Sequence, residues 1–210
     1  MAELIRGLDA GRIAHNLERV REEIGRNDVE ILAAVKYVAL EELATLAEAG
    51  ITVVGENRAQ ELEGKAAAHD GFTWDFIGQL QSRKVRTVLP LVRYVHSVCT
   101  DSALTQIEKH GTPDTRILVE VNVAREEGKS GVAPADLGDF IARSTAKVMG
   151  LMTMPPLAEK PEDSRRWFAA LAQLAAEHGL SELSMGTTQD FAVAAQEGAT
   201  IVRIGTRLYT

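Results

Sequence analysis

The strongest constraint on the fold of this chain is a repeated alternation of two kinds of segment. Short apolar runs rich in β-branched residues are followed by longer stretches in which apolar residues recur at helical spacing. The apolar runs are residues 30–36, 51–55, 74–78, 94–98, 116–122, 147–153, 182–186 and 200–205. Strands that alternate with helices pair in parallel through right-handed crossovers. The sequence therefore predicts an α/β fold with a parallel sheet.

Helices are expected near residues 40–49, 56–69, 79–89, 101–110, 134–145, 162–178 and 189–198. The longest of these carries Trp167, Leu171 and Leu174 on one face. A further helix precedes the first strand, because apolar residues recur at i, i+4, i+7 and i+11 from Ile13, and Gly25 marks its end.

Eight strands is the number that closes a (β/α)8 barrel. The structural alternative is an open doubly wound sheet, which often carries a G-x-G-x-x-G turn that this sequence lacks. We therefore expect residues 1–210 to form a single (β/α)8 TIM barrel domain preceded by an N-terminal helix.

The charge balance and the cysteine content exclude several classes of function. The formal net charge is −7, which disfavours non-specific binding to nucleic acid or to an anionic membrane. Cys99 is the only cysteine, so the chain forms no intrachain disulfide and no cysteine cluster for a metal. The N-terminus shows no signal peptide, and no run approaches the roughly 18 apolar residues of a membrane span. We expect a cytoplasmic protein.

Lys36 stands inside an apolar run, ILAAVKYVA. An unpaired ammonium removed from water costs several kcal/mol or loses its proton, so most lysines are exposed. Strand alternation places Lys36 on the same face as Leu32 and Ala34. Either Lys36 reaches past the end of the strand into solvent, or its amine has a chemical role at the mouth of the barrel.

Two glycine- and hydroxyl-rich turns follow the last two strands. In SMGTTQD, backbone N–H groups with Ser184, Thr187 and Thr188 could hold a phosphate, and VRIGT ends in Gly205 and Thr206. Helix capping would explain either turn alone. Both together favour phosphate binding, because the loops after strands seven and eight are the recurrent phosphate site of this barrel.

Arg203 is a second charge on a core strand, where it shares a face with Ile201 and Gly205. An inward arginine needs an acceptor, which could be Glu120 on the fifth strand or an atom of a ligand. Asn57, after the second strand, is another candidate for hydrogen bonding at the mouth.

A lysine amine, a phosphate-binding turn and an inward arginine together suit pyridoxal 5′-phosphate. The lysine would form a Schiff base with the aldehyde, and the arginine would face the pyridine nitrogen. A sugar-phosphate aldolase with a Schiff-base lysine would use the same parts.

The sequence also resembles the pyridoxal phosphate homeostasis proteins, single-domain relatives of the barrel domain of alanine racemase. The matching segments run in family order over nearly the whole chain: AVKYV, GENRAQE, FIGQLQSRKV, HSV, VEVNVAREEGKSGV, GLMTM, SMGTTQDF and VRIGT. The resemblance implies an alanine-racemase-like barrel, with Lys36 carrying the cofactor and Asn57 lining its pocket. It also implies that Arg203 meets the pyridine nitrogen. The residues implied to hold the phosphate are Ser184, Thr188, Gly205 and Thr206.

Several residues depart from the pattern of that family, including Cys99 where aspartate is common. Thr187 and Thr188 stand where the family usually has methionine and serine, and Asp75 stands where histidine is common. Thr188 retains a hydroxyl, so we still expect it to contact phosphate.

The expected function is to carry pyridoxal phosphate, buffer it and deliver it to apo-enzymes, without robust catalysis. The alternative is a pyridoxal phosphate-dependent alanine racemase. An arginine facing the ring nitrogen keeps that nitrogen unprotonated and weakens the ring as an electron sink. In alanine racemases an additional domain supplies the second base, and we expect no counterpart of that domain within residues 1–210. We expect a monomer or a weak homodimer.

Overall fold

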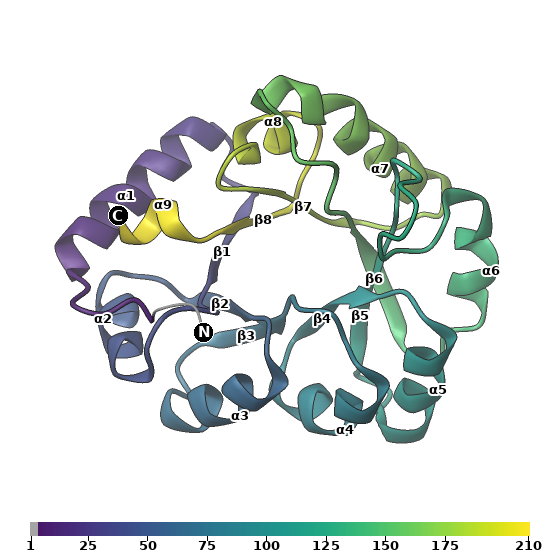
Figure 1. Cartoon of the computed structure of the whole chain (residues 1–210), viewed down its shortest axis with the longest axis horizontal. Helices are drawn as coiled ribbons and strands as arrows, with labels where there is room; N and C mark the ends of the chain where they lie inside the picture. The colour runs from purple at the N-terminus through teal and green to yellow at the C-terminus, as the bar shows by residue number, and fades with distance from the viewer. Residues whose placement is uncertain (1–3) are drawn as a thin grey trace.

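The computed structural model describes residues 4–210, whose strands form a closed barrel (Figure 1). The strands are β1 (Glu30–Ala34), β2 (Val53–Glu56), β3 (Thr73–Phe76), β4 (Tyr94–Val98), β5 (Arg116–Glu120), β6 (Lys147–Met152), β7 (Glu182–Thr187) and β8 (Ile201–Ile204). Each strand pairs in parallel with the next, and β8 pairs in parallel with β1. The predicted (β/α)8 barrel is confirmed, and the open sheet is excluded because β1 and β8 are joined.

The helices surround the barrel on its outside (Figure 1). They are α1 (Ala10–Ile24), α2 (Leu43–Glu48), α3 (Ala59–Ala68), α4 (Val85–Val88), α5 (Asp101–His110), α6 (Leu137–Ala142), α7 (Arg165–Glu177), α8 (Phe191–Gln196) and α9 (Thr206–Tyr209). Several are shorter than predicted because a 3₁₀ turn forms their first or last residues. These turns are Leu40–Glu42, Ser82–Lys84, Leu89–Leu91, Pro134–Asp136 and Pro161–Ser164.

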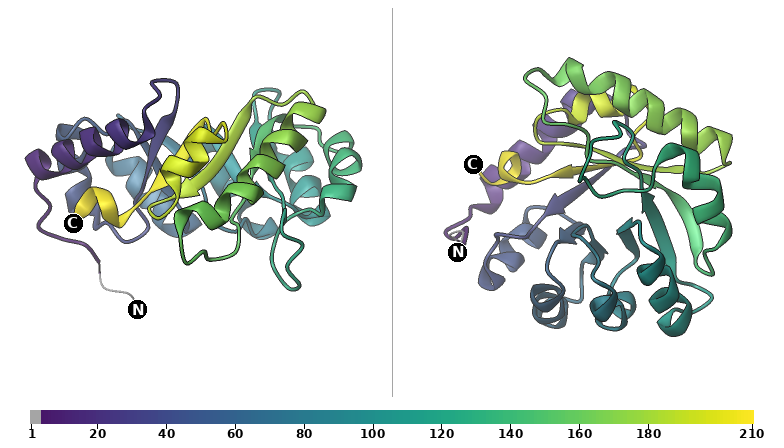
Figure 2. Two further views of the ribbon diagram at one scale, coloured as in Figure 1. Left: turned by 90° about the horizontal axis from the view of Figure 1, so that it is seen from above. Right: turned by 45° about the vertical axis from the view of Figure 1, so that its right-hand side comes forward.

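The predicted N-terminal helix is confirmed as α1. Asp9 caps its start by accepting from the Arg12 backbone N–H, and Gly25 caps its end. Helix α9 lies beside α1 (Figures 1 and 2), and the Asn16 side chain donates to the backbone oxygens of Leu208 and Thr210. Because these contacts join the two ends of the described chain, α1 covers the side of the barrel where β8 meets β1.

Within residues 4–210, buried apolar side chains form two clusters. The larger one lies between the strands and the helices, and a smaller one lies inside the barrel, formed by Leu32, Val53, Tyr94 and Ile201 with Ile77 and Met149 beside them. On β8, Ile201 faces the interior while Val202 and Ile204 join the outer cluster, as alternation predicts. The inner cluster is small, so much of the interior is left to polar side chains.

Helix α7 buries a face slightly different from the predicted one. Phe168 and Leu171 are fully buried, whereas Trp167 and Leu174 are only partly buried against the outer cluster. The apolar stripe is wide enough that spacing alone did not identify its centre. Among residues 4–210, no helix has the length and apolar character needed to cross a membrane.

Candidate functional site

A cavity of about 460 Å³ opens where the carboxyl ends of the strands meet. Six of the seven predicted binding residues line it, namely Lys36, Asn57, Thr188, Arg203, Gly205 and Thr206. The wall also includes residues that sequence reasoning did not assign to the site, among them Tyr37, Ile77, Gln79, Ser97, Ser130 and Met154. Their only sequence signal is that they lie in the last residues of a strand or in the loop that follows one, which many unrelated residues share.

Lys36 lies two residues beyond β1, because the strand ends at Ala34 and not at Lys36 as predicted. Its half-buried side chain lines the cavity, with Nζ 4.8 Å from the centre of the Tyr37 ring. Among residues 4–210, no carboxylate lies within ion-pair distance of this amine. The amine is therefore available to a ligand in the cavity.

Hydrogen bonds hold the backbone that precedes Lys36. Tyr209 Oη donates to the Ala34 carbonyl at 3.1 Å, and Lys65 Nζ donates to the Val35 carbonyl at 2.7 Å. The Val35 N–H donates to the Gly55 carbonyl at 2.9 Å. These bonds come from α9, α3 and β2, so the position of Lys36 depends on three separate parts of the chain.

A buried ion pair behind the cavity supports the same region. Lys65 Nζ lies 2.7 Å from Glu56 Oε2, and both side chains are almost completely buried. Glu56 Oε1 accepts from the backbone N–H groups of Asn57 and Arg58 at 2.6 and 3.0 Å. One pair thus fixes the backbone beside Lys36 and the backbone of Asn57. Sequence reasoning missed this pair because its partners lie on different elements and no motif connects them.

Asn57 lies against Gly78, where only glycine fits. A Cβ built at Gly78 would stand 2.0 Å from the Asn57 carbonyl oxygen. The Oδ1 atom of Asn57 is buried and has no hydrogen-bond partner among the described residues. A buried amide oxygen without a hydrogen-bond donor lowers the free energy of unfolding, and a ligand in the cavity could donate the missing hydrogen bond.

The turn after β7 is built differently from the simple phosphate-binding loop that we predicted. The Thr187 N–H and hydroxyl donate to Asp190 Oδ1 at 2.8 and 3.2 Å, so they are already engaged. The Gly205 N–H donates to Thr188 Oγ1 at 3.3 Å, which joins the two turns. Thr188 and Thr206 both line the cavity.

Gly186 allows the chain to turn from β7 toward α8. Its φ is +89°, and an added Cβ would stand 2.5 Å from Ala194 Cβ. A side chain at this position would displace the turn that carries Thr188.

Ser184 does not line the cavity, in contrast to its predicted neighbours. Its side chain is fully buried, and its hydroxyl lies 2.6 Å from Arg203 Nη1 and 2.8 Å from His96 Nδ1. The strand places Ser184 two residues before the turn, below Arg203 and inside the barrel. Its hydroxyl therefore contacts the arginine and not the cavity.

Arg203 points into the barrel as predicted, but its acceptors are not the predicted carboxylate. Nη1 donates to the Ser184 carbonyl at 2.8 Å as well as to the hydroxyl, and Nη2 donates to the Thr153 carbonyl at 2.9 Å. Glu120 instead accepts from Ser130 Oγ at 2.6 Å. Because none of these acceptors of Arg203 is charged, burial lowers the pKa of Arg203 to about 10, against the opposing charges of Asp190 and Glu120.

The Nε atom of Arg203 is the part of the guanidinium that remains free. Its two Nη atoms bind Ser184, Thr153 and the Met154 sulfur, and no partner for Nε exists within residues 4–210. Since Arg203 lines the cavity, Nε is a rigidly held donor available to a ligand.

Comparison with known proteins agrees with this geometry. Residues 8–210 match the family model described as alanine racemase, N-terminal domain. A pyridoxal phosphate homeostasis protein of Aquifex aeolicus is 38% identical over 215 residues, covering 94% of each chain. The chain belongs to the pyridoxal phosphate homeostasis protein family. A member from Escherichia coli is 31% identical, with 94% of this chain and 95% of the relative covered.

Solved structures give the same assignment. PipY of Synechococcus elongatus, solved with pyridoxal phosphate bound, has a TM-score of 0.80 and 27% identity, covering 94% of this chain and all of PipY. Alanine racemase of Corynebacterium glutamicum has a TM-score of 0.76 at 14% identity, and the match spans 61% of that enzyme. The second likeness shows a shared barrel fold only.

Proposed function

We propose that this protein binds pyridoxal 5′-phosphate in the cavity, carries it as a Schiff base with Lys36, and buffers or delivers it in the cytoplasm. The observation that carries this proposal is that a free amine, Lys36 Nζ, and a free guanidinium donor, Arg203 Nε, line one cavity. The relatives named for pyridoxal phosphate homeostasis and the ligand bound by PipY support it.

The residues present fit this cofactor. Asn57 Oδ1 is buried without a hydrogen-bond partner among residues 4–210, so a bound ligand could hydrogen-bond to it. The cavity of about 460 Å³ lies in the range of small-molecule sites. The hydroxyls of Thr188 and Thr206 and the approach at Gly205 would hold the phosphate. Ser184 would act on the site through Arg203. When bound, the cofactor would supply an aldehyde that reacts with an amine.

Arg203 would donate a hydrogen bond from Nε to the pyridine nitrogen. With a pKa of about 10, Arg203 keeps its proton at neutral pH, so the ring nitrogen would stay unprotonated. The ring would then be a poor electron sink, which supports a carrier function over one that requires a stabilised carbanion.

A racemase would need a second acid/base group opposite Lys36. Tyr209 lines the cavity, but its hydroxyl already donates to the Ala34 carbonyl. Burial raises the pKa of Tyr209, and the charge of Glu56 adds to that effect. Tyr209 is therefore poorly suited to exchange a proton with a substrate at neutral pH, which argues against the racemase alternative.

The test begins with the absorbance spectrum of the purified protein after addition of pyridoxal phosphate. A visible absorption band should form, and borohydride followed by peptide mass spectrometry should place the label on Lys36. Lys36→Ala should remove the band and the label. Lys129→Ala, at a partly exposed loop lysine paired with Glu126, is the matched control and should retain both.

Two further assays distinguish the functions. The loaded protein should restore the activity of an apo-enzyme that needs pyridoxal phosphate, and it should do so as a monomer or a weak homodimer. Conversion of L-alanine to D-alanine at about 1 per second or faster would reject the carrier function in favour of the racemase. Absence of the visible band, with turnover of a sugar phosphate, would reject both.

A further inference from the structure

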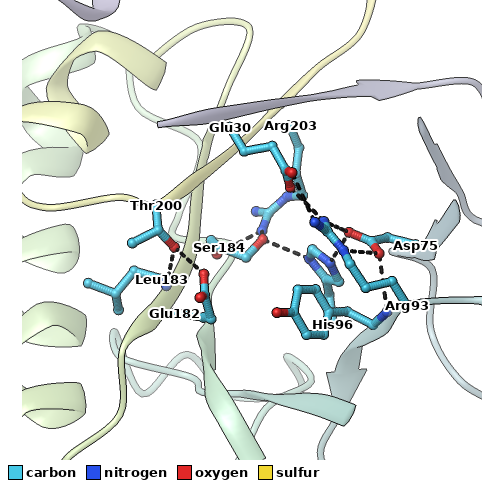
Figure 3. Close-up of polar contacts among 10 residues, drawn as sticks. Glu30, Asp75, Arg93, His96, Glu182, Leu183, Ser184, Thr200 and Arg203 are labelled. Carbon is cyan, nitrogen blue, oxygen red and sulfur yellow. Dashed lines mark hydrogen bonds and ion pairs between the residues drawn. The ribbon is translucent and has the colours of Figure 1, made fainter. Parts of the chain in front are cut away.

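A continuous line of buried polar side chains runs from Arg203 into the interior of the barrel (Figure 3). Arg203 Nη1 lies 2.6 Å from Ser184 Oγ, which lies 2.8 Å from His96 Nδ1. The other ring nitrogen, His96 Nε2, lies 3.1 Å from Asp75 Oδ2. Ser184, His96 and Asp75, which we call the buried relay, come from β7, β4 and β3 and have almost no solvent exposure. The relay thus joins three strands to the arginine of the cavity.

The far end of the relay carries an ion-pair cluster. Arg93 donates to Asp75 from Nε at 3.1 Å and from Nη2 at 2.6 Å, and it binds Glu30 at 2.9 and 2.5 Å. The Tyr94 backbone N–H donates to Asp75 Oδ1 at 3.1 Å. Glu30 and Arg93 are partly exposed near the amino ends of the strands, whereas Asp75 is fully buried. The charges of Glu30, Arg93, Asp75 and Arg203 sum to zero.

Only one arrangement of protons satisfies every bond of the relay. Burial would raise the pKa of Asp75, but hydrogen bonds from His96 and Arg93 hold it below its ordinary value, so Asp75 accepts. Burial lowers the pKa of His96, so the ring is neutral and its Nε2–H donates to Asp75. His96 Nδ1 then accepts from the Ser184 hydroxyl, whose oxygen accepts from Arg203. Every hydrogen bond points from the guanidinium toward the carboxylate.

We propose that Asp75 and His96 are positioning residues for the cofactor pocket, which act through Ser184 to fix the Arg203 guanidinium and to present its Nε–H to the cofactor ring. This inference rests on the proposed function. The two Nη atoms of Arg203 bind inside the barrel, so the plane of the guanidinium is set by the relay and by the backbone of Ser184 and Thr153. The Asp75 carboxylate is paired with Arg93 and reaches Arg203 only through His96 and Ser184.

Other titratable and charged residues lie around the buried relay, and none of them is substituted in the test. The ring of Tyr94 packs edge-on against His96, with 6.2 Å between ring centres. Glu120 and Asp190 act on Arg203, while Glu182 and Arg116 act on Tyr94. None of these residues is replaced in the variants below, so a changed pH midpoint of the cofactor absorbance would result from the change in the relay.

The test measures the pH midpoint at which the absorbance of bound pyridoxal phosphate changes. Asp75→Asn keeps the shape and the acceptor oxygen but removes a buried negative charge. The cationic nitrogen at Lys36 is then less stabilised, so the midpoint should fall by roughly half a pH unit or more. Ser184→Ala interrupts the relay and should also move the midpoint. The double variant should move it no further than Asp75→Asn alone, because both changes break one line of contacts.

Thr200→Val is the matched control. Thr200 Oγ1 donates to Glu182 at 2.8 Å and accepts from the Leu183 N–H at 2.9 Å, and no bond links it to Arg203 (Figure 3). The Thr200→Val variant loses two side-chain hydrogen bonds, the same number as Ser184→Ala, yet its midpoint should be that of the wild type. An unchanged midpoint in Asp75→Asn, or additive shifts in the double variant, would overturn the proposal.

A second measurement needs no cofactor. Nitrogen-15 NMR of the unloaded protein should show His96 neutral at pH 7 with its proton on Nε2, and Asp75→Asn should change that signal. A protonated ring, or a proton on Nδ1, would overturn the relay even if the cofactor binds. Failure of the wild type to bind pyridoxal phosphate, with the expected His96 signal intact, would instead reject the proposed function.

Discussion

The barrel interior has an upper half, which contains the cavity at the carboxyl ends of the strands, and a lower half, which contains Asp75, His96 and Arg93. The two halves differ in how completely their polar groups are paired. In the lower half, Asp75 accepts bonds from Arg93, His96 and the Tyr94 backbone. In the upper half, Asn57 Oδ1 has no partner among residues 4–210, and within those residues no carboxylate lies at ion-pair distance from Lys36. Removing one partner of a buried pair is strongly destabilising, whereas a buried polar group without a partner carries a desolvation cost that a ligand can offset. We infer that the polar groups of the lower half maintain the structure and that those of the upper half bind a ligand.

The largest effect should come from breaking the lower half. Asp75→Ala would leave Arg93 with one carboxylate and His96 Nε2 without an acceptor, so the free energy of unfolding should fall by about 3–5 kcal/mol. Urea unfolding of the unloaded protein measures this. Asp114→Ala, which removes an exposed ion pair with Lys147, is the control and should cost less than about 1 kcal/mol. Equal losses would remove the distinction between the two halves.

The pH dependence of stability should identify the lower half as the acid-sensitive one. Burial lowers the pKa of His96 below 6.5, so the unfolded chain binds more protons and stability should decline as the pH falls below about 6.5. Asp75, whose pKa lies below 3.8, should add a second decline as the pH falls further. Urea unfolding at a series of pH values checks this. His96→Gln should flatten the first decline only, and an unchanged profile would show that His96 does not contribute.

A substitution in the upper half should separate stability from binding. Asn57→Ala removes an amide whose Oδ1 already lacks a partner, so the free energy of unfolding should change by less than about 1 kcal/mol. Retention of pyridoxal phosphate on dialysis should nevertheless weaken several-fold. A stability loss as large as that of Asp75→Ala would mean that both halves are structural.

The smallest effect on stability should come from Gly205→Ala. The nearest atom to an added Cβ is Ala34 Cβ at 3.9 Å, so unfolding should change by less than about 0.5 kcal/mol. The methyl group would enter the cavity and reduce the affinity for pyridoxal phosphate, as measured by absorbance titration. Gly78→Ala is the contrasting variant, because its Cβ meets the Asn57 backbone and should cost roughly 1–3 kcal/mol. Unchanged cofactor affinity in Gly205→Ala would exclude Gly205 from the phosphate site.

The sequence by itself determined the barrel architecture and identified Lys36 and Arg203 as charged residues in apolar runs, although it left the direction of Lys36 open. Strand and helix periods are local properties of neighbouring residues, so eight strands could be located from spacing, and alternation placed Lys36 with Leu32 and Ala34 and Arg203 with Ile201. The same reasoning located two glycine- and hydroxyl-rich turns after the last two strands, which we predict to hold the phosphate. Strand ends were predicted less accurately than strand positions. The first strand was predicted to end at Lys36, but β1 ends two residues earlier, at Ala34.

Only the tertiary structure decided which side chains meet. The acceptors of Arg203, the Lys65–Glu56 pair and the contact of Ser184 with His96 join residues far apart in sequence. Such contacts depend on the register of each strand against its neighbours and on the closure of the barrel. No spacing within one segment encodes them, because a side chain's partner on another strand is set by packing in three dimensions.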